Sequence, residues 1–403
     1  MPGPATPRIP RLVYTGTGDN IFTLTPADGQ VRQLTWSWEK KDAGTAAQSP
    51  SAHLTHTWPA WAPDGSRVAC FGLRGTQETS LYAVAADGVE SWELAGLSGG
   101  LPIYGNWSPR ADTFAVLVQR GERQLSLETV TLARPGHTTP LVSGAPLFWS
   151  WSPRGDRLAV QVGGSSQQAS AAARILVLEA TSGQIVREVS TRPGEFRVPA
   201  WSPQDEILAY VEQDTHEGDR LLLFDVASGD SAPVASTSGP TVALWSADGS
   251  FLAFGWTARP GSVVFSTVQV LDLASGRVLP LLDEAVAGFF WSPQGDALLY
   301  LSLDAQRTHL RWQRLARASG EKTELARFLP SREQAFCLSF FDQYAHSHPL
   351  VAPDGSALAF AGHLLGVEAL DATAPAQIYV LPLDRVAVPS PIAPGQFVCW
   401  NLA

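Results

Sequence analysis

The chain has 403 residues, 45% of them hydrophobic and 16% charged, and its formal net charge is −10 at pH 7. Nucleic-acid backbones are bound by clustered Lys and Arg, so this acidic balance argues against a nucleic-acid partner. The sequence contains no run of 18 apolar residues, and a membrane-spanning helix is therefore not expected.

The cysteine content and the N-terminal sequence exclude further classes of protein. Cys70, Cys337 and Cys399 form no C-x-x-C pair, so neither a disulfide framework nor a zinc site is expected. Residues 1–10 are Pro-rich and lack an apolar signal core. They predict a loose tail and a cytoplasmic protein, or a periplasmic or secreted one if a leader has been removed. No phosphate loop or dinucleotide fingerprint is present, and no cofactor is expected.

The first predicted elements are three strands, at residues 11–14, 21–24 and 31–34, with the turn Ala27-Asp28-Gly29 between the last two. This group has no opening strand that ends in Trp. The run 396–401, QFVCWN, supplies the missing sequence at the other end of the chain. We therefore expect the C-terminal strand to complete the N-terminal sheet, which would remove an exposed sheet edge.

Between these ends, one sequence unit recurs. Its clearest copy is WSPRGDRLAV at residues 151–160, and its first position falls at Trp61, Trp107, Trp151, Trp201, Trp245, Trp291 and, in a worn copy, Val351. The spacings of 46, 44, 50, 44, 46 and 60 residues indicate one supersecondary unit used repeatedly. A period of about 40–50 residues rich in short strands is typical of a β-propeller blade.

Each copy reads as a strand, a turn and a second strand. The aromatic residue ends an apolar run, and the Pro two positions later has no N–H to continue the ladder. Asp-Gly pairs such as Asp64-Gly65 then supply the turn, because Gly tolerates positive φ and Asp bonds its own backbone. Three copies depart from this chemistry, with Ala111 in the Gly position, Ala247 in the Pro position and Asp205-Glu206 in place of the Gly-polar pair.

The repeated Trp-Ser-Pro-Asp-Gly-x-x-Leu-Ala unit resembles the WD40-like (PD40) repeat of the TolB propeller family, and related repeats occur in the propellers of prolyl oligopeptidase-type peptidases. The resemblance covers nearly the whole chain and implies an all-β fold. Counting the seven copies and the composite sheet gives an eight-bladed β-propeller, with seven blades as the alternative if the worn Val351 copy forms no blade. Residues 1–403 are then one propeller domain.

Two long insertions interrupt the period, at residues 36–57 and 326–350. Loops of this length in a compact domain are usually functional or disordered. The middle of the first, residues 43–51, is rich in Ala, Ser and Gln and is expected to be flexible. The second is aromatic and anchored by Pro, so an ordered segment is expected there.

Candidate ligand-binding residues follow from the repeat register. The innermost strand of each blade borders the central channel, and side chains three and five positions before the Trp share one face of that strand. These positions, together with neighbouring residues of the second insertion, predict a site at the channel mouth made of His56, Trp58, Tyr104, Phe148, Asp342, Gln343, Tyr344, His346, His348 and Phe397.

Three of these residues are histidines, and imidazole binds divalent transition metals. A metal held by His56, His346 and His348 is therefore one hypothesis, and hydrogen-bonding loop anchors are the simpler alternative. Some propeller lyases that act on pectate fragments use a His/Gln metal site, but no motif here matches theirs.

The sequence thus favours a non-catalytic scaffold, acting as a monomer, that binds a protein or a small molecule across its channel mouth. The alternative is a metal-dependent lyase or hydrolase of carbohydrate or peptide, with the histidines as ligands or acid–base groups.

Overall fold

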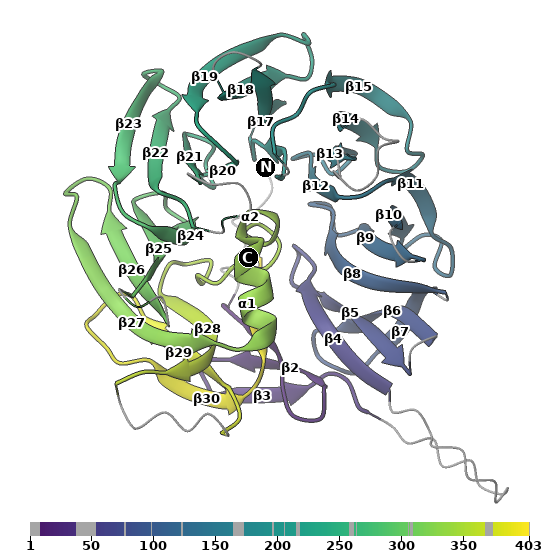
Figure 1. The fold of residues 1–403 in the computed structure, drawn as a ribbon. Helices are drawn as coiled ribbons and strands as arrows, with labels where there is room; N and C mark the ends of the chain where they lie inside the picture. Colours follow the sequence, from purple (N-terminus) through teal and green to yellow (C-terminus); the bar gives the residue numbers. More distant parts are fainter. Residues whose placement is uncertain are drawn as a thin grey trace, which may run out of the picture.

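The computed structural model describes residues 9–37, 54–75, 78–97, 99–121, 124–163, 173–195, 197–204, 206–214, 218–257, 262, 264–304, 306, 309–366 and 374–402. Antiparallel sheets stand radially around a central axis, the arrangement of a β-propeller (Figure 1). Most of the Pro-rich tail, and residues 43–51 of the first insertion, lie outside the described residues.

One four-stranded sheet joins both ends of the chain. Its order is β3-β2-β1-β31, with β1 (Leu12–Thr15), β2 (Ile21–Thr25), β3 (Gln30–Gln33) and β31 (Phe397–Trp400). β31 runs antiparallel to β1, and Tyr14 lies opposite Val398. The C-terminal strand therefore occupies the inner edge of the N-terminal sheet.

Five further four-stranded sheets follow in chain order within the described ranges. Their strands are β4 (Leu54–Trp61), β5 (Arg67–Arg74), β6 (Glu78–Ala85) and β7 (Ser91–Gly96); β8 (Gly100–Trp107), β9 (Thr113–Arg120), β10 (Gln124–Thr131) and β11 (Thr139–Ser143); β12 (Leu147–Trp151), β13 (Arg157–Val162), β14 (Arg174–Glu179) and β15 (Ile185–Ser190); β16 (Ala200–Trp201), β17 (Ile207–Asp214), β18 (Gly218–Asp225) and β19 (Ser231–Thr237); and β20 (Thr241–Trp245), β21 (Phe251–Trp256), β22 (Thr267–Asp272) and β23 (Arg277–Leu282).

The last sheet has seven strands, because β27 also pairs with β28. Its strands in order are β24 (Val286–Trp291), β25 (Ala297–Leu303), β26 (Leu310–Ala316), β27 (Lys322–Pro330), β28 (Ala357–Leu364), β29 (Gln377–Pro382) and β30 (Ser390–Pro394). An isolated bridge joins Val351 to Leu358 of β28, where the other copies of the repeat have an inner strand.

The repeated turn is held by its own side chains. In the copy at residues 151–160, the Gly155 N–H donates to the Ser152 carbonyl, and the Ser152 hydroxyl accepts from the Arg157 N–H at 3.1 Å. Gly155 has φ of 68°, the left-handed region that Gly enters at little cost. Ala111 takes the same conformation, with φ of 58°, although an L side chain is strained there.

The repeated indole joins neighbouring sheets. In four copies its Nε1–H donates to the carbonyl of the residue just before the corresponding position of the preceding copy, at 2.9–3.1 Å: Trp107 to Ala60, Trp245 to Ala200, Trp291 to Leu244 and Trp400 to Leu350. These donors and acceptors are buried, so each bond satisfies two groups that would otherwise be costly to desolvate. The Trp repeat thus sets the contact between sheets as well as the core within them.

Two short helices, α1 (Arg332–Ser339) and α2 (Phe341–Tyr344), lie over the centre of the ring (Figure 1). They belong to the second insertion, and the propeller-repeat argument did not anticipate helices there. Ser331 begins α1 by accepting a hydrogen bond from the Gln334 N–H at 3.2 Å.

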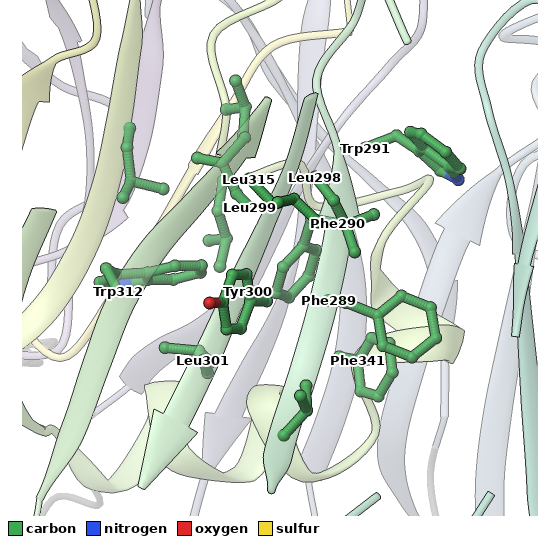
Figure 2. Close-up of a cluster of buried hydrophobic side chains, with 14 of the residues drawn as sticks. Phe289, Phe290, Trp291, Leu298, Leu299, Tyr300, Leu301, Trp312, Leu315 and Phe341 are labelled. Carbon is green, nitrogen blue, oxygen red and sulfur yellow. The ribbon is translucent and has the colours of Figure 1, made fainter. Parts of the chain in front are cut away.

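The helices connect the two sides of the ring. Phe341 packs on Phe289 and Phe290, with ring centroids 5.0 and 5.6 Å apart (Figure 2). Cys337 and Tyr344 instead belong to the hydrophobic cluster formed by residues of the first half of the chain, between Val13 and Ala180, and by β31. We call residues 331–350 the axial plug, because they cover the centre of the propeller and contact strands on both sides of it.

Candidate functional site

The predicted channel-mouth residues do not border an open channel, because the axial plug occupies it. Trp58, Tyr104, Phe148 and Phe397 lie on the inner strands and pack against the plug. Their ring partners within 6.0 Å include the plug residues Phe336, Phe340, Tyr344 and His348. Residues of the plug therefore cover the predicted aromatic surface.

Trp58 departs from the predicted alternation. Its φ is 54°, and the pairing of β4 with β5 shifts register between Thr57 and Ala60. A bulky residue at positive φ is a strained conformation that surrounding contacts must hold. The Trp58 ring lies 5.5 Å from Phe336 and 5.9 Å from Tyr344, so contacts with the plug accompany this bulge.

Gln343 docks the plug onto the sheet of β12. Its Oε1 accepts from the Trp149 N–H at 3.2 Å, and its Nε2 donates to the Trp149 carbonyl at 2.9 Å. β12 is the inner edge of its sheet, so these two backbone groups have no neighbouring strand on the axial side. The Gln343 amide supplies both missing partners, as a strand would.

A second polar network anchors the end of the plug. The Tyr104 hydroxyl donates to the Gln343 carbonyl at 3.1 Å and lies 2.8 Å from Ser347 Oγ. Ser347 Oγ lies 2.8 Å from His348 Nδ1. Burial lowers the pKa of His348 to about 3, so the imidazole is neutral at pH 7.

His56 lies apart from this network. Its imidazole packs 6.0 Å from the Tyr82 ring, and burial lowers its pKa to about 4. Across the described residues, no three His, Cys, Asp or Glu side chains form a group able to hold a metal ion. The structure therefore does not gather His56, His346 and His348 into one set of ligands.

An open cavity lies at the other end of the inner strands, beside the repeated turns. It has a volume of about 340 Å³. Its wall consists of the Trp residues and prolines that end successive inner strands, among them Trp61, Trp107, Trp149, Trp151 and Trp201. The plug contributes Asp342, Gln343, His346 and Ser347. We call this space the turn-side cavity.

Asp342 is the unusual member of that lining. Its side chain is only 5% exposed, and among the described residues neither carboxylate oxygen has a hydrogen-bond partner. Leaving a buried polar group unpaired is expensive, and more so for a charge. Two indole donors of the same lining, Trp61 Nε1 and Trp201 Nε1, are also buried without a partner in the described part of the chain.

His346 faces both this cavity and an adjoining one of about 370 Å³ lined by Trp245, Trp291 and Val351. The imidazole is open to solvent within these cavities, yet it lies deep in the protein, and desolvation lowers its pKa. It therefore adds no positive charge near neutral pH.

A smaller cavity of about 190 Å³ lies near the starts of the inner strands, between α1 and the sheets of β8 and β12. Tyr104, Phe148, Gln343 and Tyr344 line it together with Phe336 and Phe340. The predicted site residues thus fall into separate places. Asp342, Gln343 and His346 line the turn-side cavity, and Tyr104, Phe148, Gln343 and Tyr344 line the smaller one. Trp58 and Phe397 pack against the plug, His348 lies within it, and His56 lies near Tyr82.

The sequence argument missed the tryptophans as cavity walls, because it treated them only as core residues. The signal was available, since a ring of equivalent Trp-Ser-Pro turns must surround the axis at one end of the inner strands.

No family model and no curated protein matches this chain. Solved structures do match it. A eukaryotic initiation factor aligns with a TM-score of 0.57 and 8% identity, over 98% of both chains. An oligogalacturonate lyase in complex with manganese aligns with a TM-score of 0.53 and 15% identity, over 92% of this chain and 95% of that one.

A TolB from Acinetobacter baumannii aligns with a TM-score of 0.37 and 13% identity, over 68% of this chain and 65% of that one. The chain spans about half the length of the puromycin hydrolases that it matches, 48% and 49% of those chains. All these identities are low, so the likeness concerns the fold, which is a β-propeller. No family model confirms the TolB resemblance seen in the repeats. Neither helix among the described residues is long and apolar enough to cross a membrane.

Proposed function

We propose that this chain is an eight-bladed propeller of the TolB-like type that acts as a non-catalytic binding module. The count treats the seven-stranded sheet as two blades joined at β27 and β28. The bridge of Val351 to Leu358 supports this division, because it stands where an inner strand would begin the second blade. The Trp400 indole bond to the Leu350 carbonyl repeats the contact between neighbouring blades and supports closure through the composite blade.

The ligand that we propose is a small molecule bound in the turn-side cavity. The observation that carries this proposal is the cavity itself, a concave space of about 340 Å³ walled mainly by tryptophans and prolines from successive sheets. Binding sites are commonly concave and mostly apolar, with a few placed polar groups that orient the ligand.

This proposal moves the site from the channel mouth predicted at Trp58, Tyr104 and Phe148, which the plug covers, to the turns at the far ends of the same strands. No metal or other cofactor enters it, and the chain is taken to act as a monomer.

A lyase or hydrolase of carbohydrate or peptide is the second candidate. One observation favours it, since the exposed His346 lines this cavity and an imidazole is chemically suited to acid–base work. The two candidates differ in what happens to the bound molecule. A binding module returns it unchanged, whereas an enzyme converts it and loses turnover in His346→Ala.

The test is a small-molecule screen by ligand-observed NMR on the wild-type protein and on a variant with the cavity filled. Val198 lines the cavity and is partly exposed there, so Val198→Trp should place an indole in the binding space. Val386→Trp is the matched control, because Val386 is fully exposed and lies outside that lining.

We expect ligands of the wild-type protein to bind Val386→Trp and to be lost from Val198→Trp. Ligands that bind all three proteins equally would show that the turn-side cavity is not the site.

A further inference from the structure

The smaller cavity, between α1 and the sheets of β8 and β12, is almost entirely apolar. It has a volume of about 190 Å³, and no charged residue is among the described residues that line it. Most of its wall consists of aliphatic and aromatic side chains, among them Ile103, Leu125, Leu147, Phe148, Phe336 and Phe340. None of these six lines the turn-side cavity, so the two spaces are separate sites.

The polar side chains of this lining are mostly engaged within the protein. The Tyr104 hydroxyl donates to the Gln343 carbonyl, and the Gln343 amide bonds the backbone of Trp149. The Trp149 indole N–H donates to Asn106 Oδ1. The hydroxyl of Tyr344 remains, and it is uncharged at pH 7, because burial raises the pKa of that phenol further. A charged ligand would therefore lose its water here without gaining a charged partner.

The size and the lining of the cavity fit one aromatic ring with a small substituent. An apolar cavity of about 150 Å³ is enough to bind benzene. The Phe340 ring lies 5.3 Å from Phe336 and 6.0 Å from Phe148, at interplanar angles of 52° and 42°. Rings inclined in this way present both edges and faces to an aromatic ligand. Phe336 is 40% exposed, so the cavity opens to solvent beside it.

We propose that this cavity is a second binding site, which takes a small neutral aromatic molecule between the axial plug and the inner strands β8 and β12. The ligand contacts Phe336 and Phe340 of the plug and Phe148 of β12. Removal of apolar surface from water drives its binding. The site does not depend on the proposed function, because its ligand lies outside the turn-side cavity.

Isoleucine methyl signals provide the test. The chain has eight isoleucines, of which only Ile103 is among the described residues that line this cavity, and none lines the turn-side cavity. Protein labelled at the Ile δ1-methyl groups is titrated by NMR with toluene, and with benzylamine and benzoate, which are close in size but charged at pH 7. Ile103→Val identifies the Ile103 signal by removing it.

We expect toluene to shift the Ile103 signal of the wild-type protein with a Kd of about 1 mM or lower, and the charged analogues to bind at least about tenfold more weakly. The signal of Ile185, which is 53% exposed and outside the lining, should stay in place. Leu125 lines the cavity and is partly exposed, so Leu125→Trp should fill it and abolish the response. Leu279→Trp is the matched control, because Leu279 is exposed on another sheet.

Other results overturn the second site. An Ile103 signal that toluene leaves unmoved in the wild-type protein refutes it, and this measurement requires no variant to fold. Charged analogues that bind as tightly as toluene refute the neutral class of ligand. A toluene response that survives in folded Leu125→Trp places the ligand elsewhere. If toluene binds without shifting Ile103 and its binding is lost in Val198→Trp, the turn-side cavity is the site, which supports the proposed function and refutes this inference.

Discussion

Replacing Gln343 by Leu tests whether the plug is a structural part of the propeller. Leu has a similar size but no polar atoms, so the Trp149 N–H and carbonyl would lose the bonds now measured at 3.2 and 2.9 Å. Trp149 is only 1% exposed, and water has little access to replace those bonds. Each buried backbone group left unpaired costs about 1–3 kcal/mol, which gives about 2–6 kcal/mol for the pair.

The assay is thermal and urea unfolding of the ligand-free protein. An unfolding entropy of about 2.1 cal/mol/K per residue over 403 residues is about 0.8 kcal/mol/K, so the expected loss in Tm is about 2–7 °C. Gln294→Leu is the control. Its amide bonds the Asp354 carbonyl at the exposed surface, where water replaces the contact and the change should stay within about 0.5 kcal/mol. If Gln343→Leu costs no more than this control, the plug does not stabilise the ring through the Trp149 backbone.

Three other perturbations address the turns, the buried imidazole and the joined termini. Ala111→Gly should raise the free energy of unfolding by about 1 kcal/mol, because it removes the strain of an L residue at positive φ. Urea melts should show no such gain for Ala247→Gly, a turn position without positive φ. Burial lowers the pKa of His348 from 6.5 to about 3, so the unfolded chain takes up the proton first. The neutral, buried imidazole therefore contributes stability that is complete above pH 6.5 and is lost as the pH falls toward 3, with about 2 kcal/mol lost at pH 5. His348→Gln should flatten that pH dependence, whereas a flattening also seen for the exposed His137→Gln would contradict the assignment. Trp400→Phe removes the indole donor to a buried carbonyl and should cost about 1–3 kcal/mol in urea unfolding; an unchanged midpoint would argue against this contact as a joint between the last blade and the first.

The repeat predicted the strands well, because its signals are local. The runs at 11–14, 21–24 and 31–34 match β1, β2 and β3 to within one residue, and the pairing of residues 396–401 with the N-terminal sheet is present as β31 against β1. Alternation of apolar residues and the chemistry of the Pro and Gly turns act over a few positions, so they can be read without tertiary information.

The candidate site was predicted less well. The register predicted that Tyr104 and Phe148 face the channel but said nothing of what occupies it. At Trp58 a positive φ and a register shift break the alternation on which the prediction rested. The helices were missed for a related reason, since α1 has eight residues and α2 four. Isolated helices shorter than about 12–15 residues are marginal in water, so these two depend on contacts with distant strands.

The amino-acid sequence alone determined the strand–turn unit, its repetition and the meeting of the two ends in one sheet. The tertiary structure alone decided that residues 331–350 fill the axis and that Asp342 lies unpaired beside a ring of tryptophans. The reason is physical. A turn or a strand is specified by neighbours in the chain, whereas the environment of Asp342 is made by side chains from sheets on several sides of the axis, which only the closed packing of the propeller brings together.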